Sequence, residues 1–267
     1  MRRLLRVILA QAKITILSSF QYRVQEGMQL LGLLVEAVIY LVVWTTIARA
    51  RGGEVGGYSA GEFAAYFIAW TFVRNATTGW SPWGIEWRIR RGEFNALLLR
   101  PVHPYYADLG DMLGGKIIQT ITLLPTMALL AVAFRPEFTP VPWALAALVP
   151  ALILAFLLRY TLMYAMSITA FWTTRVTALF EAWYAVEFFL SGRVAPLSVL
   201  PEWAQRIADV LPFRWMFSFP LELALGRLTP AEAALGFLYQ VLWIAAMALV
   251  FRFVWRAAVR RYAAVGG

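Results

Sequence analysis

Six long apolar stretches constrain this chain more than any other feature of its sequence. They lie at residues 27–48, 59–75, 109–134, 143–169, 178–191 and 233–251. In hydrocarbon, backbone polar groups find partners only within helices or closed barrels, and about 20 apolar residues span the bilayer as a helix. The sequence is 61% hydrophobic and only 15% charged, whereas soluble domains carry roughly 25% charged residues. We therefore predict an all-α polytopic membrane protein with six transmembrane helices. A soluble all-helical fold is the disfavoured alternative.

Basic and apolar residues are interleaved along the first 26 positions. Arg2, Arg3, Arg6, Lys13 and Arg23 alternate with leucines and isoleucines that recur on roughly one helical face. This pattern is typical of an amphipathic helix lying on an anionic membrane surface. We predict an interfacial helix over residues 1–26, with a plain extension of the first span as the alternative. No cleaved signal peptide is expected, and residues 1–267 are predicted to form a single transmembrane domain.

Lysine and arginine are distributed unevenly between the connections. If both termini lie in the cytoplasm, 16 of the 24 basic residues fall on the cytoplasmic side and seven on the outer side, with Arg159 inside a span. Membrane proteins concentrate positive charge on the cytoplasmic side, so the count predicts an N-in/C-in topology. The net charge of +9 then reflects topology and contact with anionic membrane lipids rather than nucleic-acid binding.

Residues 80–105 form the most densely charged part of the chain. Five charges fall within eight positions: Glu86, Arg88, Arg90, Arg91 and Glu93. Three tryptophans typical of a membrane interface bracket them: Trp80, Trp83 and Trp87. Each charge would cost a few kcal/mol at the bilayer centre, so the segment is predicted to lie in the cytoplasm. We expect a helix broken near Gly92 that a partner contacts, and a solvated loop is the alternative.

Residues 192–232 are punctuated by prolines. These stand at positions 196, 201, 212, 220 and 230. The partly apolar pieces between them, at 201–211 and 213–225, are too short to span a bilayer and suit re-entrant or interfacial helices. We predict an extracellular re-entrant segment.

Four ionisable residues fall within apolar stretches: Glu36, Arg159, Glu181 and Glu187. An ionisable side chain at membrane depth is usually paired or functional. Arg159 is expected either to pair with one of the acids or to contact a substrate, and the sequence leaves both open.

No cofactor or metal site is predicted in the chain, and no catalytic residues. Gly110–Ile117 matches the first part of a phosphate-binding loop, but Ile117 replaces the Ser/Thr that would hold magnesium. His103 is the single histidine and cysteine is absent, which excludes the usual zinc motifs. Asp108 and Asp111, one turn apart, stand where a helix dipole favours acids.

Two parts of the sequence resemble the ABC-2-type permeases, the membrane subunits of bacterial ATP-binding-cassette exporters. The first is Ile89-Arg-Arg-Gly92-Glu93-Phe94 followed by Leu98-Leu99-Arg100-Pro101, which is similar to their cytoplasmic loop. The second is similar to their extracellular re-entrant helices and runs from Ser191-Gly192-Arg193 through Pro196, Pro201-Glu202-Trp203 and Pro212-Phe213 to Pro220. The resemblance covers essentially the whole chain, and the order and spacing of the motifs are more specific than either motif alone.

The resemblance implies a permease of the bacterial plasma (inner) membrane that binds no ATP itself. Its partners would be a cytosolic ABC ATPase, holding ATP and Mg, and a second permease that is either a copy or a paralogue. The resemblance places the ATPase contact at Glu86, Arg88, Arg90, Arg91, Gly92, Glu93, Phe94, Leu98, Leu99, Arg100 and Pro101. It places the outer gate at Gly192, Arg193, Pro196, Pro201, Trp203, Pro212 and Phe213.

Two other functions remain open at this point. An ion-coupled secondary transporter would use Glu36, Arg159, Glu181 and Glu187 as its coupling network, although such transporters usually carry an internal repeat and none is found here. A membrane enzyme acting on lipids would need a catalytic constellation that the sequence does not offer. Drugs, lipids, peptides and polysaccharide precursors all remain possible substrates.

Overall fold

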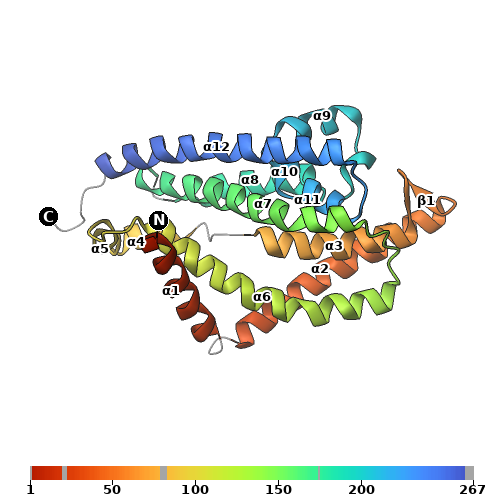
Figure 1. Cartoon of the computed structure of the whole chain (residues 1–267), viewed down its shortest axis with the longest axis horizontal. Coiled ribbons are helices and arrows are strands. Elements are labelled where there is room, and N and C mark those ends of the chain that lie inside the picture. Colours follow the sequence, from red (N-terminus) through yellow and green to blue (C-terminus); the bar gives the residue numbers. More distant parts are fainter. Residues whose placement is uncertain (1, 20–22, 79–82, 174, 262–267) are drawn as a thin grey trace.

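A computed structural model describes residues 2–19, 23–78, 83–173 and 175–261, which are almost entirely helical (Figure 1). The longest helices are α2 (Arg23–Ala50), α6 (Pro104–Phe134), α7 (Pro142–Ile168) and α12 (Pro230–Arg261). The shorter ones are α1 (Arg2–Ser19), α3 (Ala60–Thr77), α4 (Trp83–Arg90), α5 (Phe94–Leu98), α8 (Thr177–Leu190), α9 (Glu202–Val210), α10 (Pro212–Met216) and α11 (Ser218–Ala224). Strands β1 (Glu54–Val55) and β2 (Tyr58–Ser59) pair antiparallel, and Thr169–Phe171 and Leu197–Val199 are 3-10 turns.

Among the described residues, four helices are long and apolar enough to cross a membrane: Leu31–Ala50, Pro104–Phe134, Pro142–Phe171 and Pro230–Arg261. The other two predicted spans, 59–75 and 178–191, correspond to α3 and α8. Helix α8 is too short, with 14 residues, and the 18-residue α3, which contains Glu62 and Arg74, is not apolar enough over its length. The prediction of a helical membrane protein is therefore confirmed, and four of the six predicted spans qualify by length and composition.

The two ends of the bundle differ. Figure 1 places the start of α1, α4, α5 and the last turns of α12 at one end, and the β1–β2 hairpin at the other. Local sequence explains several helix ends. Ser59 and Glu62 form a capping box that starts α3, Pro142 occupies the first turn of α7, and α6 ends at Arg135, whose φ is +47°.

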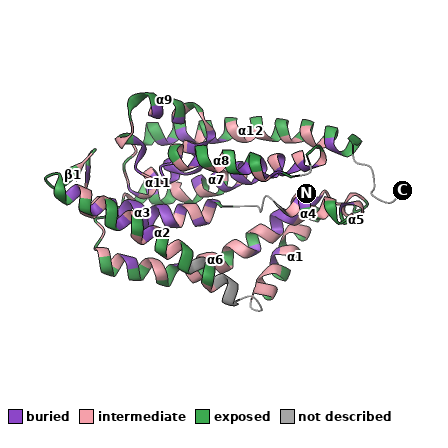
Figure 2. Cartoon of the chain, turned by 180° about the vertical axis from the view of Figure 1, so that it is seen from behind, coloured by how far each residue is buried: buried purple, intermediate pink, exposed green. Residues whose placement is uncertain are grey.

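Buried residues concentrate along α3 and α7, which lie inside the bundle (Figure 2). One core surrounds Tyr160 and Tyr164 of α7, and a second surrounds Phe63 and Phe67 of α3. The outer faces of α2, α6 and α12 instead expose many large apolar side chains. A water-soluble surface would not carry so many, so these faces suit contact with lipid or with another subunit.

α1 packs tightly against the first half of α6. A Cβ atom on Gly110 would lie 2.4 Å from the carbonyl oxygen of Ile8, and one on Gly114 would lie 2.5 Å from that of Ala12. The two glycines therefore serve helix packing, and residues 110–117 all lie inside α6, so they form no phosphate-binding loop. Residues 20–22 of the predicted 1–26 helix and residues 80–82 of the charged segment lie outside the described residues.

Candidate functional site

The charged segment folds as two short helices, α4 and α5, joined by a turn at Gly92. The φ angle of Gly92 is +71°, a conformation that glycine adopts without the steric cost of a Cβ. The predicted helix break near Gly92 is therefore confirmed, and the alternative of a plain loop is wrong.

Glu86 faces the protein interior. Its side chain is buried, one carboxylate oxygen accepts a hydrogen bond from the backbone N–H of Val176 at 3.2 Å, and the other lies 3.6 Å from Arg90. Val176 immediately precedes α8. Glu86 thus ties α4 to the start of α8 and is not available to a partner protein.

Arg88 and Phe94 anchor the same segment to three other helices. The Arg88 guanidinium lies 2.9 Å from the Asp108 carboxylate of α6, which also accepts a hydrogen bond from the Tyr164 hydroxyl of α7 at 3.0 Å. Phe94 is fully buried, with its ring 6.0 Å from that of Trp255 in α12. A displacement of α4 and α5 would therefore be transmitted to α6, α7, α8 and α12.

The remaining side chains of the segment form its outer surface. Leu99 is 87% exposed, and the Arg91 guanidinium lies over the Trp87 ring at 3.4 Å. The exposed members of the predicted contact set are Arg90, Arg91, Glu93, Leu99, Arg100 and Pro101, whereas Gly92 and Leu98 are half-buried. This surface is basic and apolar.

A cavity of about 490 Å³ lies beside this surface, between α1, α5 and the start of α6. Its walls include Arg3, Arg88, Arg100 and Asp108. Asp111 also lines the cavity, so its walls carry charges of both signs.

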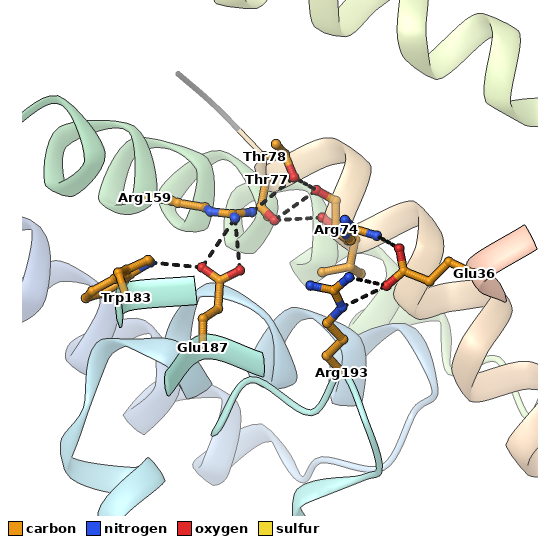
Figure 3. Close-up of polar contacts among 9 residues, drawn as sticks. Glu36, Arg74, Thr77, Thr78, Arg159, Trp183, Glu187 and Arg193 are labelled. Atoms are coloured by element: carbon orange, nitrogen blue, oxygen red, sulfur yellow. Dashed lines mark hydrogen bonds and ion pairs between the residues drawn. The ribbon is translucent and has the colours of Figure 1, made fainter. Parts of the chain in front are cut away.

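A second polar cluster lies within the bundle (Figure 3). Glu36, near the midpoint of α2, accepts hydrogen bonds from Arg74 of α3 and from the Nε of Arg193, the latter at 2.7 Å. Arg193 follows α8 and lies over the ring of Phe188 at 5.2 Å. The indole N–H of Trp44 in α2 also donates to the carbonyl of Val194 at 2.6 Å, so the chain after α8 is held against α2.

Arg159 of α7 and Glu187 of α8 form a buried ion pair in the same cluster. One guanidinium nitrogen lies 3.0 and 3.3 Å from the two carboxylate oxygens of Glu187. The other end nitrogen donates to the Thr78 hydroxyl at the end of α3 at 3.0 Å, and the indole of Trp183 donates to Glu187 at 3.0 Å. The two side chains are only 5% and 8% exposed, so each depends on the other for its charge balance.

A family model of ABC-2 family transporter proteins matches residues 34–266. The chain belongs to the ABC-2 transporter family. The matched range includes the charged segment, the ion-pair cluster and residues 192–232. A comparison with curated proteins gives no match. Family membership and the four candidate spans make the chain a multi-pass helical membrane protein with a permease-type role in transport.

In this ABC-2 protein, Arg159 pairs with Glu187, one of the acids that the sequence offered. Glu36 instead joins Arg74 and Arg193, while Glu181 is exposed and takes part in neither ion pair. The topology count had assigned Arg74 and Arg193 to opposite sides of the membrane, and this assignment is wrong because one carboxylate binds both. Without them the distribution is 15 to six, which still favours the same orientation.

The proline-rich segment folds as the short helices α9, α10 and α11. Pro212 and Phe213 are buried, and the Phe213 ring lies 4.5 Å from that of Trp183, which bonds Glu187. Gly192 is held by a hydrogen bond from the Tyr66 hydroxyl to its carbonyl at 2.7 Å. Pro196 is also buried, whereas Pro201 and Trp203 of the predicted gate set are exposed.

Other charged residues in the bundle have separate partners. Arg214 pairs with Asp209 and lies 3.7 Å from Glu222. Asp108 and Asp111 do not act together, because Asp111 accepts from Thr15 of α1 whereas Asp108 binds Arg88. Within residues 2–19, 23–78, 83–173 and 175–261, no three His, Cys, Asp or Glu side chains gather in a way that would hold a metal ion.

Proposed function

We propose that this chain is the permease subunit of an ABC exporter. It pairs with a second permease, either a copy or a paralogue, in a bacterial plasma membrane, and a separate cytosolic ATPase holding ATP and Mg drives it. Membership of the ABC-2 family carries this proposal. In this account the ATPase docks on the exposed surface of α4 and α5.

The anchoring of that surface supports the coupling role. Glu86, Arg88 and Phe94 connect α4 and α5 to α8, α6 and α12, so the docking element moves with the helices rather than as a free loop. Closure of the ATPase pair would push on the exposed side chains and tilt these helices. The anchors and the exposed side chains therefore have different tasks, although they alternate in the sequence.

The proposal includes six membrane-crossing segments, with α3 and α8 completing the set and both termini in the cytoplasm. The start of α1, α4, α5 and the last turns of α12 share one end of the bundle (Figure 1), which supports this orientation. α3 is short and mostly buried, as suits a span surrounded by other helices. Residues 192–232 then lie on the outer side, with α10 and α11 entering beside α7 as the outer gate.

The test is affinity purification of the tagged chain from its native cells in mild detergent, with the co-purifying proteins identified by mass spectrometry. The test variant combines Arg91→Ala, Glu93→Ala and Leu99→Ala, all exposed at the docking surface. The matched control combines Glu202→Ala and Arg206→Ala, an exposed ion pair on α9.

We expect an ATPase with wild type and control, and much less with the test variant. Equal recovery of the ATPase with wild type, control and test variant would mean that the ATPase contacts another part of the chain. If no ATPase is recovered while the purified chain transports on an ion gradient, the chain is a secondary transporter instead.

A further inference from the structure

The ion-pair cluster contains more positive than negative charge. Three guanidiniums, those of Arg74, Arg159 and Arg193, face two carboxylates, those of Glu36 and Glu187, which leaves 3 − 2 = +1. Arg74 also lies close enough to Arg159 and Arg193 for the guanidiniums to repel one another. The carboxyl end of α3, beside Arg74, offsets about half an elementary charge. A net positive charge remains between two candidate spans.

Three buried side-chain donors on α3 and α7 also lack a hydrogen-bond acceptor within the described residues. The side-chain nitrogens of Trp70 and Asn75 and the Nε of Arg159 are buried without an acceptor in the described structure. Buried donors nearly always have a partner. An anionic group bound at Arg74 and Arg193 would offset the excess positive charge, and the buried donors show that the surroundings of these arginines are poor in acceptors.

The arginines that bind Glu36 are accessible from outside the chain. The side chains of Arg74 and Arg193 are each 25% exposed, and that of Glu36 is 21% exposed. Figure 3 shows both guanidiniums directed at the same carboxylate. Exposed apolar residues lie on the neighbouring turns of α2 and α8: Val35, Ile39, Val186 and Phe189. A molecule that reaches the arginines from this side meets hydrocarbon around a positively charged centre.

We infer that Arg74 and Arg193 bind the acidic head of an anionic amphiphile, a phosphate or carboxylate joined to an apolar body, as the transported substrate. The inference rests on the proposed permease function. Glu36 holds the two guanidiniums together, and a bound acidic head would share them with Glu36. Two anionic groups, the Glu36 carboxylate and the acidic head, would then face the guanidiniums of Arg74 and Arg193. The exposed apolar side chains of α2 and α8 would contact the body of the amphiphile.

The test uses the full chain in nanodiscs of neutral phosphatidylcholine, without any ATPase. Dodecyl phosphate is titrated, and binding is followed by tryptophan fluorescence. Dodecyltrimethylammonium, with the same chain and the opposite charge, and inorganic phosphate, with no chain, are titrated as probes of the two recognition features.

Three substitutions distinguish charge recognition from a structural role. Arg193→Gln removes the excess charge and is expected to weaken dodecyl phosphate binding about ten-fold or more. Glu36→Gln increases the excess positive charge and is expected to tighten dodecyl phosphate binding. If these residues had only a structural role, Arg193→Gln and Glu36→Gln would both weaken binding. Arg193→Lys keeps the charge and should retain most of the affinity. Arg206→Gln, on the exposed face of α9, should change nothing.

Binding of dodecyl phosphate with opposite effects of Arg193→Gln and Glu36→Gln would support the inference. Equal weakening by both, no binding, or equal binding of the cationic amphiphile would overturn it. Equal binding of inorganic phosphate would overturn the requirement for an apolar body. Because this assay needs no ATPase, its failure leaves the permease proposal standing. Conversely, absence of an ATPase partner would refute the permease proposal while anion binding could still be measured.

Discussion

Removing Arg159 alone is expected to destabilise the protein strongly. Arg159→Met deletes both contacts to Glu187, the hydrogen bond to Thr78 and the packing over the Phe217 ring at 4.7 Å. It leaves a buried carboxylate whose one remaining donor among the described residues is the indole of Trp183. Breaking a buried ion pair by removing one partner costs about 3–5 kcal/mol. The 5% and 8% exposure of the two side chains leaves little water to reduce this cost.

A double-mutant cycle gives the sharpest measurement of this pair. Arg159→Met, Glu187→Leu and the double variant are unfolded in mixed detergent micelles and compared with wild type. Replacing both members of a buried pair with apolar residues is often neutral, so the double variant should lie within about 2 kcal/mol of wild type. If the double variant instead loses the sum of the two single effects, Arg159 and Glu187 are not energetically coupled and the argument fails.

Three further predictions concern backbone fit and pH. Gly114→Leu should detach α1 from α6 and expose it to protease, while Gly115→Leu should not, because a Cβ on Gly115 meets nothing within 4 Å. Gly192→Ala should lower the melting temperature more than Gly57→Ala: both have positive φ, but only the Gly192 Cβ meets other atoms, at 2.5 Å. His103 caps α6 as an acceptor, and burial lowers its pKa. The stability that this cap gives the folded protein should therefore be complete above about pH 6.5. It should be lost as pH falls through the lower pKa of His103 in the folded state. Melting curves should show wild type losing more stability than His103→Asn between neutral and acidic pH, because asparagine keeps an acceptor without titrating.

Local chemistry made several features predictable. Gly92 stands where the chain needs positive φ, and prolines at 201 and 212 directly precede or open α9 and α10. The apolar stretches gave the long helices because backbone satisfaction in hydrocarbon leaves few other structures. The cost of burying Arg159 predicted either an acidic partner or a substrate contact, and the structure shows the acidic partner.

The burial of individual side chains and the choice of ion-pair partners depend on how the helices pack, which the sequence alone does not reveal. Glu86 looks like the other charges of its segment, yet it is buried because the start of α8 passes beside it. Glu36, Glu181 and Glu187 were equivalent partners for Arg159 until the helices were placed. Phe94 was expected at the ATPase contact, but it is fully buried because its ring packs against α12.

Site-specific photo-crosslinking tests the central claim of ATPase coupling most directly. A photoreactive amino acid is placed at Leu99, 87% exposed beside α5, and, as control, at Val210, 72% exposed on α9. The account predicts that an ATP-binding-cassette ATPase is crosslinked in native cells from position 99 and not from position 210. If position 99 captures no such ATPase, or both positions capture it equally, the coupling account is contradicted.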